Sequence, residues 1–208
     1  MKAIADIVRE EEVDLLVSGA LPKEGLFKYF VGSIARKLCR AVDCSVLLMT
    51  APQKKAHPCR VIAVNTDMDA CDGSTVNVAF RFADCFSSEE VHLVQELDPH
   101  RVKVRVEDDS SLDAFNTAKE VLRESETVRL QAMIEGIHRP ERAHTQTDFV
   151  FGKPGVTLAH YAQSIRSDLI VTNAPTDKSR LIDRVFMSGI EYILGDLPCD
   201  IMLVRKTQ

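Results

Sequence analysis

The chain has 208 residues, of which 45% are hydrophobic and 27% charged, and its formal net charge is -5. This acidic balance argues against a nucleic-acid partner, which would favour a basic face. No apolar run reaches the roughly 18–20 residues that a membrane helix needs, and acidic residues at positions 6 and 10–12 interrupt any signal-peptide core. We therefore expect a cytoplasmic protein without direct membrane insertion.

The chain opens with a helix end and a strand. The acidic run at residues 10–12 is typical of a solvated helix end. Residues 13–19 follow as a strand, and their consecutive apolar residues predict burial on both faces. An i, i+4 stripe then predicts an amphipathic helix, formed by Leu26, Phe30, Ile34 and Leu38. A short apolar strand over 44–49 completes this first part of the chain.

A polar linker separates this part from a second unit. Residues 51–58 hold two prolines and two lysines without apolar periodicity, so they cannot form a core element. Strands are expected next at 60–65, 91–94 and 146–151, with a helix after each. A long, polar-rich middle helix should end near Gly136 and Pro140, and its first apolar residues are these: Leu112, Phe115, Ala118, Val121 and Leu122. This alternation predicts an α/β fold whose parallel sheet is covered on both faces.

The strongest signal is an internal repeat. Asp14 and Asp168 open similar strands 154 positions apart, and Cys44 and Cys199 open similar strands 155 positions apart. The extra residue falls in a loop, where insertions are tolerated. A second helical stripe lies between Asp168 and Cys199: Leu181, Val185, Gly189 and Ile193. The chain therefore divides into a half repeat at 1–52, a linker at 53–58 and a complete five-stranded repeat at 59–208.

Three blocks carry a family resemblance. The block from Asp14 through Gly32-Ser33 to Cys44 resembles the C-terminal half of universal stress proteins. The block from Asp168 to Cys199 resembles the same half again, and residues 60–97 are similar to the family's opening strand–helix–strand. The resemblance implies a flavodoxin-like (adenine nucleotide alpha hydrolase-like) sheet with strand order 3-2-1-4-5, plus a half repeat.

The resemblance also implies a nucleotide site. ATP-binding members carry the pattern G-x-x-G-x9-G-[ST] after the fourth strand, because glycines let backbone N–H groups approach phosphate closely. In the half repeat, Gly19 and Gly32-Ser33 keep the interval of 13 residues. Pro22 replaces the middle glycine and removes an N–H donor, and Gly25 is a candidate to compensate. The alternative is that Gly19 and Gly32 serve only turns and close packing.

The complete repeat has lost this pattern. Asn173 stands at the first glycine, Met187 precedes Ser188 at the last, and Asp177 near the middle would repel phosphate. Asn65 replaces the family's aspartate after the first strand, and an asparagine can still bond a ribose hydroxyl. We expect weak binding of ATP or AMP, with Mg²⁺ only alongside nucleotide. The candidate binding residues are Gly19, Gly25, Gly32, Ser33, Asn65, Asn173 and Ser188.

Enzyme motifs are missing. The sequence has no Walker-type loop, no nucleophile elbow and no dinucleotide fingerprint, so slow ATP hydrolysis is the most that we expect. The six cysteines lack metal-ligand spacing and are expected to be reduced structural thiols. The function expected is a stress-response or regulatory module. The alternative is a dimerisation or regulatory domain that binds no nucleotide and is related to the cytosolic tail of a transporter.

The expected partner is a second copy of the chain, with an unknown protein partner as the alternative. The family dimerises through its last strand, and the half repeat has no first strand beside residues 14–19. Exposed strand edges favour pairing, and a closed two-fold assembly is the commonest outcome for soluble chains. We therefore expect a homodimer through the last strands and the half repeat. The cysteine-led strands 44–49 and 199–204 should pair, within one chain or between chains.

Overall fold

The computed structural model describes residues 2–22, 29–50, 58–66, 73–102, 109–174 and 189–205. Its helices are α1 (Lys2–Glu10), α2 (Ser33–Ala41), α3 (Ser74–Phe86), the 3-10 turn η1 (Pro99–Arg101), α4 (Asp109–Ile134), α5 (Val156–Ser164) and α6 (Gly189–Gly195). Its strands are β1 (Leu15–Gly19), β2 (Leu21–Pro22), β3 (Tyr29–Phe30), β4 (Ser45–Met49), β5 (Val61–Asn65), β6 (Glu90–Leu97), β7 (His144–Phe151), β8 (Leu169–Asn173) and β9 (Asp200–Val204).

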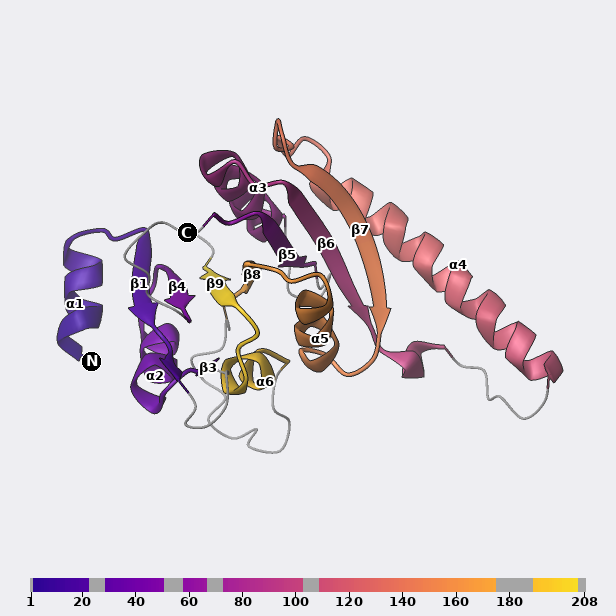
Figure 1. Ribbon diagram of the computed structural model, residues 1–208, viewed down its shortest axis with the longest axis horizontal. Coiled ribbons are helices and arrows are strands. Elements are labelled where there is room, and N and C mark those ends of the chain that lie inside the picture. The colour runs from indigo at the N-terminus through magenta and orange to yellow at the C-terminus, as the bar shows by residue number, and fades with distance from the viewer. Residues whose placement is uncertain are drawn as a thin grey trace.

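One mostly parallel sheet of seven strands runs through the molecule (Figure 1), in the order β1-β4-β9-β8-β5-β6-β7. Within the complete repeat, β7-β6-β5-β8-β9 is the expected order 3-2-1-4-5, and all four pairings are parallel. One core lies between the sheet and α3 with the end of α4. The other lies beneath α1, α2, α5 and α6. The predicted fold class is therefore confirmed.

The half repeat joins the complete repeat between the second and third strands of the sheet, β4 and β9. β1 pairs with β4 in parallel, and β4 pairs with β9 in the antiparallel direction, with Leu47 opposite Met202. These two residues occupy the same repeat position, since 47 plus 155 is 202. The two strands that follow Cys44 and Cys199 thus pair within one chain, which is one of the two predicted alternatives. A pseudo-two-fold axis passes between Leu47 and Met202.

Contacts around this axis repeat in equivalent pairs. The Arg205 N–H donates to Ser45 Oγ at 3.1 Å, and the Thr50 N–H donates to Asp200 Oδ1 at 2.7 Å. Positions 45 and 200 are equivalent, and so are positions 50 and 205, because each pair differs by 155. In both contacts, the backbone N–H just after one strand donates to the side chain of the first residue of the other strand.

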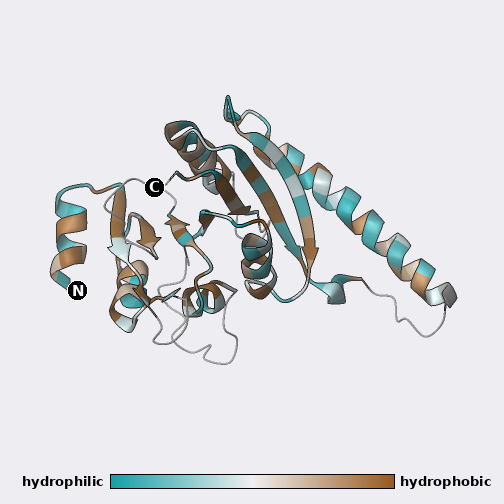
Figure 2. Ribbon diagram, in the orientation of Figure 1, coloured by the Kyte–Doolittle hydropathy of each residue, from teal (hydrophilic) through white to brown (hydrophobic). Residues whose placement is uncertain are grey.

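The strand β1 differs from its expected burial. The side chains of Leu15 and Val17 are exposed, whereas Leu16 packs against the core on the opposite face. Figure 2 shows this apolar strand at one edge of the sheet, beside α1. The apolar run would suit burial on both faces, but no described element covers the outer edge of β1 or the face of Leu15 and Val17. This agrees with the expectation that the half repeat has no first strand beside it.

The helix after β1 also differs from the expected stripe. α2 begins at Ser33, Phe30 lies in β3, and Ile34 is exposed. Leu38 is buried as expected, and Val31 and Cys39 are buried with it. In α6, Ile193 is buried as expected and Leu194 is buried beside it. The remaining stripe residues Leu26, Leu181 and Val185 lie outside the described residues, as does most of the expected linker.

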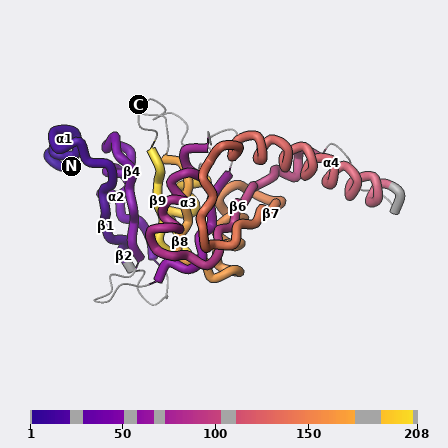
Figure 3. Tube along the Cα trace, turned by 90° about the horizontal axis from the view of Figure 1, so that it is seen from above, coloured from indigo at the N-terminus to yellow at the C-terminus, as the bar shows by residue number. Residues whose placement is uncertain are grey.

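The long helix α4 ends at Ile134, near the predicted end, and its apolar residues differ in burial. Leu112 and Val121 are exposed, whereas Leu130 and Ile134 are buried. Figures 1 and 3 show why, since the first half of α4 runs out past the end of the sheet. Leu112 and Val121 therefore remain exposed.

Candidate functional site

The candidate site of the complete repeat lies where β5 and β8 end. The chain leaves β5 toward β6 on one side, and β8 pairs with β5 on the other, so their carboxyl ends mark the topological switch point where α/β sheets bind ligands. Asn65 is the last residue of β5 and Asn173 the last of β8. The structure thus brings these two candidates to the same edge. Ser188 lies outside the described residues, with Asp177 and Met187.

The side chains at this edge bond to protein groups. The Asn65 amide donates to Thr172 Oγ1 at 3.3 Å, and the Thr75 hydroxyl donates to Asn173 Oδ1. Thr75 lies in the first turn of α3, and it and Thr172 are both buried. Sequence reasoning did not single out either threonine. Their sequence positions were the available signal, because Thr172 precedes Asn173 and Thr75 lies in the first turn of the helix after β5.

The loop of the half repeat is arranged differently. Gly19 ends β1, and a Cβ added there would meet no atom within 4 Å. Gly32 precedes α2 with φ -62°, and a Cβ added there would lie 3.0 Å from Leu21 Cδ1. Leu21 and Pro22 form β2, which pairs with β3 in the antiparallel direction. Gly32 is thus a close-packing glycine, whereas Gly19 faces open space.

The other half-repeat candidates are only partly placed. Ser33 is the first residue of α2, and Gly25 lies outside the described residues. Gly19 and Ser33 therefore mark the end of a strand and the start of the following helix, as the resemblance implied.

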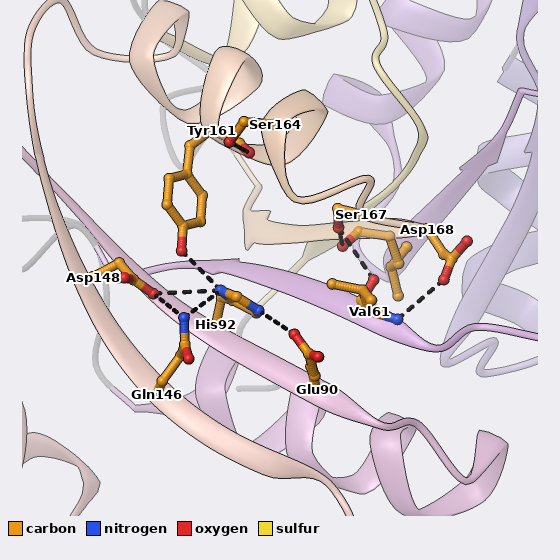
Figure 4. A network of polar contacts seen from close by, with 10 residues as sticks. Val61, Glu90, His92, Gln146, Asp148, Tyr161, Ser164, Ser167 and Asp168 are labelled. Carbon is orange, nitrogen blue, oxygen red and sulfur yellow. Dashed lines mark hydrogen bonds and ion pairs between the residues drawn. The ribbon is translucent and has the colours of Figure 1, made fainter.

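A buried polar network ties β6, β7 and α5 together (Figure 4). His92 on β6 is 4% exposed, and its Nδ1 lies 2.8 Å from the Tyr161 hydroxyl and 3.4 Å from Asp148 Oδ2. Its Nε2 lies 2.9 Å from Glu90 Oε2. Burial, together with the nearby Asp148 carboxylate, raises the pKa of Tyr161 far above its ordinary value, so the phenol stays protonated at neutral pH. The network holds α5 against the sheet.

Two further carboxylates are fixed by the fold. Glu96 accepts the N–H groups of Gly155 and Leu158, each at 2.8 Å, and so fills the anion-attracting end of α5. Glu126 is 1% exposed and accepts from Gln95 and Arg101, each at 2.7 Å. Burial alone would raise the pKa of Glu126, but these hydrogen bonds and the arginine charges lower it.

Three of the described cysteines belong to the core, Cys59 is partly buried, and Cys85 is exposed. Cys39, Cys44 and Cys199 are buried, and burial raises the pKa of the Cys39 thiol to about 11. Burial likewise raises the pKa of Cys59 to about 12. Within the described part of the chain, no three potential metal ligands gather, and no helix has the length and apolar character to cross a membrane.

The fold and the switch-point geometry define a doubly wound α/β protein. Residues 2–49 match the sequence model of the universal stress protein family. A search of curated proteins found no match. The family match covers the half repeat, and it agrees with the family resemblance of the sequence motifs there.

Solved structures agree on the fold. A universal stress protein from Archaeoglobus fulgidus DSM 4304 is 13% identical, with a TM-score of 0.61 over 98% of this chain. A functionally unknown protein from Pseudomonas aeruginosa PAO1 is 19% identical, also with a TM-score of 0.61 over 98% of this chain. The chain spans 67% of the length of each of these structures.

Proposed function

We propose that the chain is a stress-response or regulatory module whose complete repeat binds ATP or AMP only weakly. The observation that carries this proposal is the internal bonding at the switch point, where Asn65 bonds to Thr172 and Thr75 bonds to Asn173. A nucleotide would have to displace these bonds before it gained its own. Each exchange of one hydrogen bond for another contributes little net free energy, so the expected affinity is low.

The half repeat supports only part of a nucleotide site. Gly19 leaves room for a ligand, but Leu21 covers Gly32. The half repeat also has no counterpart of β5, and therefore no residue equivalent to Asn65 to hold a ribose. A nucleotide there would be held at its phosphates alone, with Mg²⁺ arriving only as part of MgATP.

Thermal unfolding of the full chain with and without millimolar MgATP tests this proposal. A ligand well above its Kd stabilises the folded state by RT ln(1 + [L]/Kd), so weak binding should raise Tm by no more than about one degree. Saturable binding with a shift of several degrees would contradict the proposal if Asn65→Ala removed it. Gly19→Ala is the matched variant in the half repeat, because its added Cβ meets no atom within 4 Å.

A second candidate function is regulation through protein contacts without nucleotide. The specific observation is that β4 and β9 pair with each other along their edges, whereas no described strand pairs with the outer edge of β1. A homodimer was expected to form through the last strands and the half repeat. Because the last strands are already paired, only the half repeat remains available for a dimer contact. The isolated chain should self-associate through β1, and light scattering at low micromolar concentration would contradict this if it found a stable monomer.

A further inference from the structure

The half repeat exposes a set of large apolar side chains on α1 and β1. These are Ile4 (40% exposed), Ile7 (54%), Leu15 (37%) and Val17 (54%). Isolated exposed apolar residues are common on protein surfaces. These four, however, come from a helix and a strand that are adjacent in the chain, and all four share one relation to the complete repeat.

Each has a covered counterpart in the complete repeat at a constant offset of 154. Ile4 corresponds to Leu158 and Val17 to Val171, both fully buried, and Leu15 corresponds to Leu169, which is 2% exposed. The fourth counterpart is Tyr161, which Ile7 replaces and which contacts His92 on β6. The exposed set in the half repeat is therefore the set that neighbouring elements cover in the complete repeat.

Those neighbouring elements are identified by their contacts. Leu169 pairs with Ile62 of β5, and Leu169 and Val171 share a core with Phe80 of α3. The Leu158 N–H donates to Glu96 of β6 at 2.8 Å. The cover is thus a single strand–helix–strand unit made of β5, α3 and β6.

The backbone of β1 offers the matching edge. The Ala20 N–H donates to the Met49 carbonyl at 2.8 Å, as the equivalent Ala174 N–H donates to Val204. Because backbone groups alternate along a strand, Leu15, Val17 and Gly19 direct theirs away from β4. On β8 the corresponding edge is taken by β5, in parallel.

A second copy of this chain cannot supply the cover, because its own β5 and α3 are buried in its own repeat, with Ile62, Val64 and Phe80 at 0% exposure. We propose that α1 and β1 bind a strand–helix–strand unit of the same type from another polypeptide segment. Its first strand lies parallel to β1, its helix covers Leu15 and Val17, and its second strand lies under Ile4 and Ile7. This inference rests on the proposed regulatory function and names the binding partner for it. Without that unit, the chain self-associates through β1.

The repeat offset supplies a direct experiment. In the complete repeat, residue 155 is followed by Val156, whose equivalent in the half repeat is Lys2. Residues 58–155 joined directly to Lys2 therefore place the strand–helix–strand unit before α1 in the way that it precedes α5. Hydrogen exchange is then measured at Val17 and Gly19 in the full chain and in the extended chain. We expect at least about tenfold slower exchange in the extended chain, together with loss of self-association.

Val17→Pro is the matched control. Proline is tolerated on an unpaired strand edge, so the full chain carrying it should fold normally, whereas the extended chain carrying it should lose the protection at Gly19. Equal exchange at β1 with and without the added unit would overturn the proposal, and so would an added unit that stays unfolded beside β1. Neither readout involves nucleotide, so this failure would leave the proposed weak ATP binding unaffected.

Discussion

The half repeat and the complete repeat contain nearly the same strand with different surroundings. Leu15–Gly19 and Leu169–Asn173 both begin with leucine and carry valine at the third position. In β8 four of the five residues are buried, whereas none is buried in β1. The comparison teaches that an apolar run makes a strand suited to burial, and that its neighbours decide whether burial occurs.

The largest expected effect comes from truncating the same residue in both strands. Leu169→Ala should lower the free energy of unfolding by about 2–5 kcal/mol, because it opens a cavity in a closed core. Leu15→Ala should cost less than about 1 kcal/mol, because its side chain is already exposed. Urea unfolding of both variants measures the difference. Equal losses of unfolding free energy would show that β1 is covered in solution, and would contradict the contrast between β1 and β8.

A second pair compares one helix position in the two repeats. A Cβ on Gly189 would lie 2.9 Å from the Gly155 nitrogen, and backbone cannot move aside cheaply. Gly189→Ala should therefore cost about 1–3 kcal/mol through overpacking. Ile34 stands at the equivalent position, since 34 plus 155 is 189, and it is exposed. Ile34→Ala should change stability by less than about 0.5 kcal/mol, and thermal unfolding of both variants checks the contrast.

The smallest expected effect lies where the two repeats meet. Arg36 Nη1 lies 2.8 Å from Glu191 Oε2, at equivalent positions and in partial burial. Arg36→Glu or Glu191→Arg should each cost about 1–2 kcal/mol, and combining them should recover part of that loss. A double-mutant cycle by urea unfolding measures the coupling, and strictly additive losses would show that the pair does not contribute.

Much of the fold could be predicted from the sequence, because repeats and apolar runs are local signals. The strand order followed from the family resemblance, and the end of α4 followed from Gly136. The exposure of Ile34, Leu112 and Val121 has one cause. Apolar spacing identifies a face that could be buried, but it cannot say whether another element lies against that face.

The candidate site was predicted less completely. Asn65 and Asn173 do meet at the switch point, because the carboxyl ends of adjacent parallel strands share one edge. Their partners Thr172 and Thr75 were not foreseen, since side-chain pairing depends on geometry that spacing does not contain. The same holds for His92, whose partners Gln146 and Tyr161 are 54 and 69 positions away in the sequence.

The pseudo-two-fold axis has a consequence for how the two repeats could diverge. In a true symmetric dimer, a residue near the axis faces its own copy, so a glutamate there would repel another glutamate. Joining the copies in one chain removes that constraint, and Arg36 faces Glu191 instead. Covalent linkage also holds partner surfaces at millimolar effective concentration. The junction between β4 and β9 therefore forms independently of protein concentration, and its two sides are free to become complementary rather than identical.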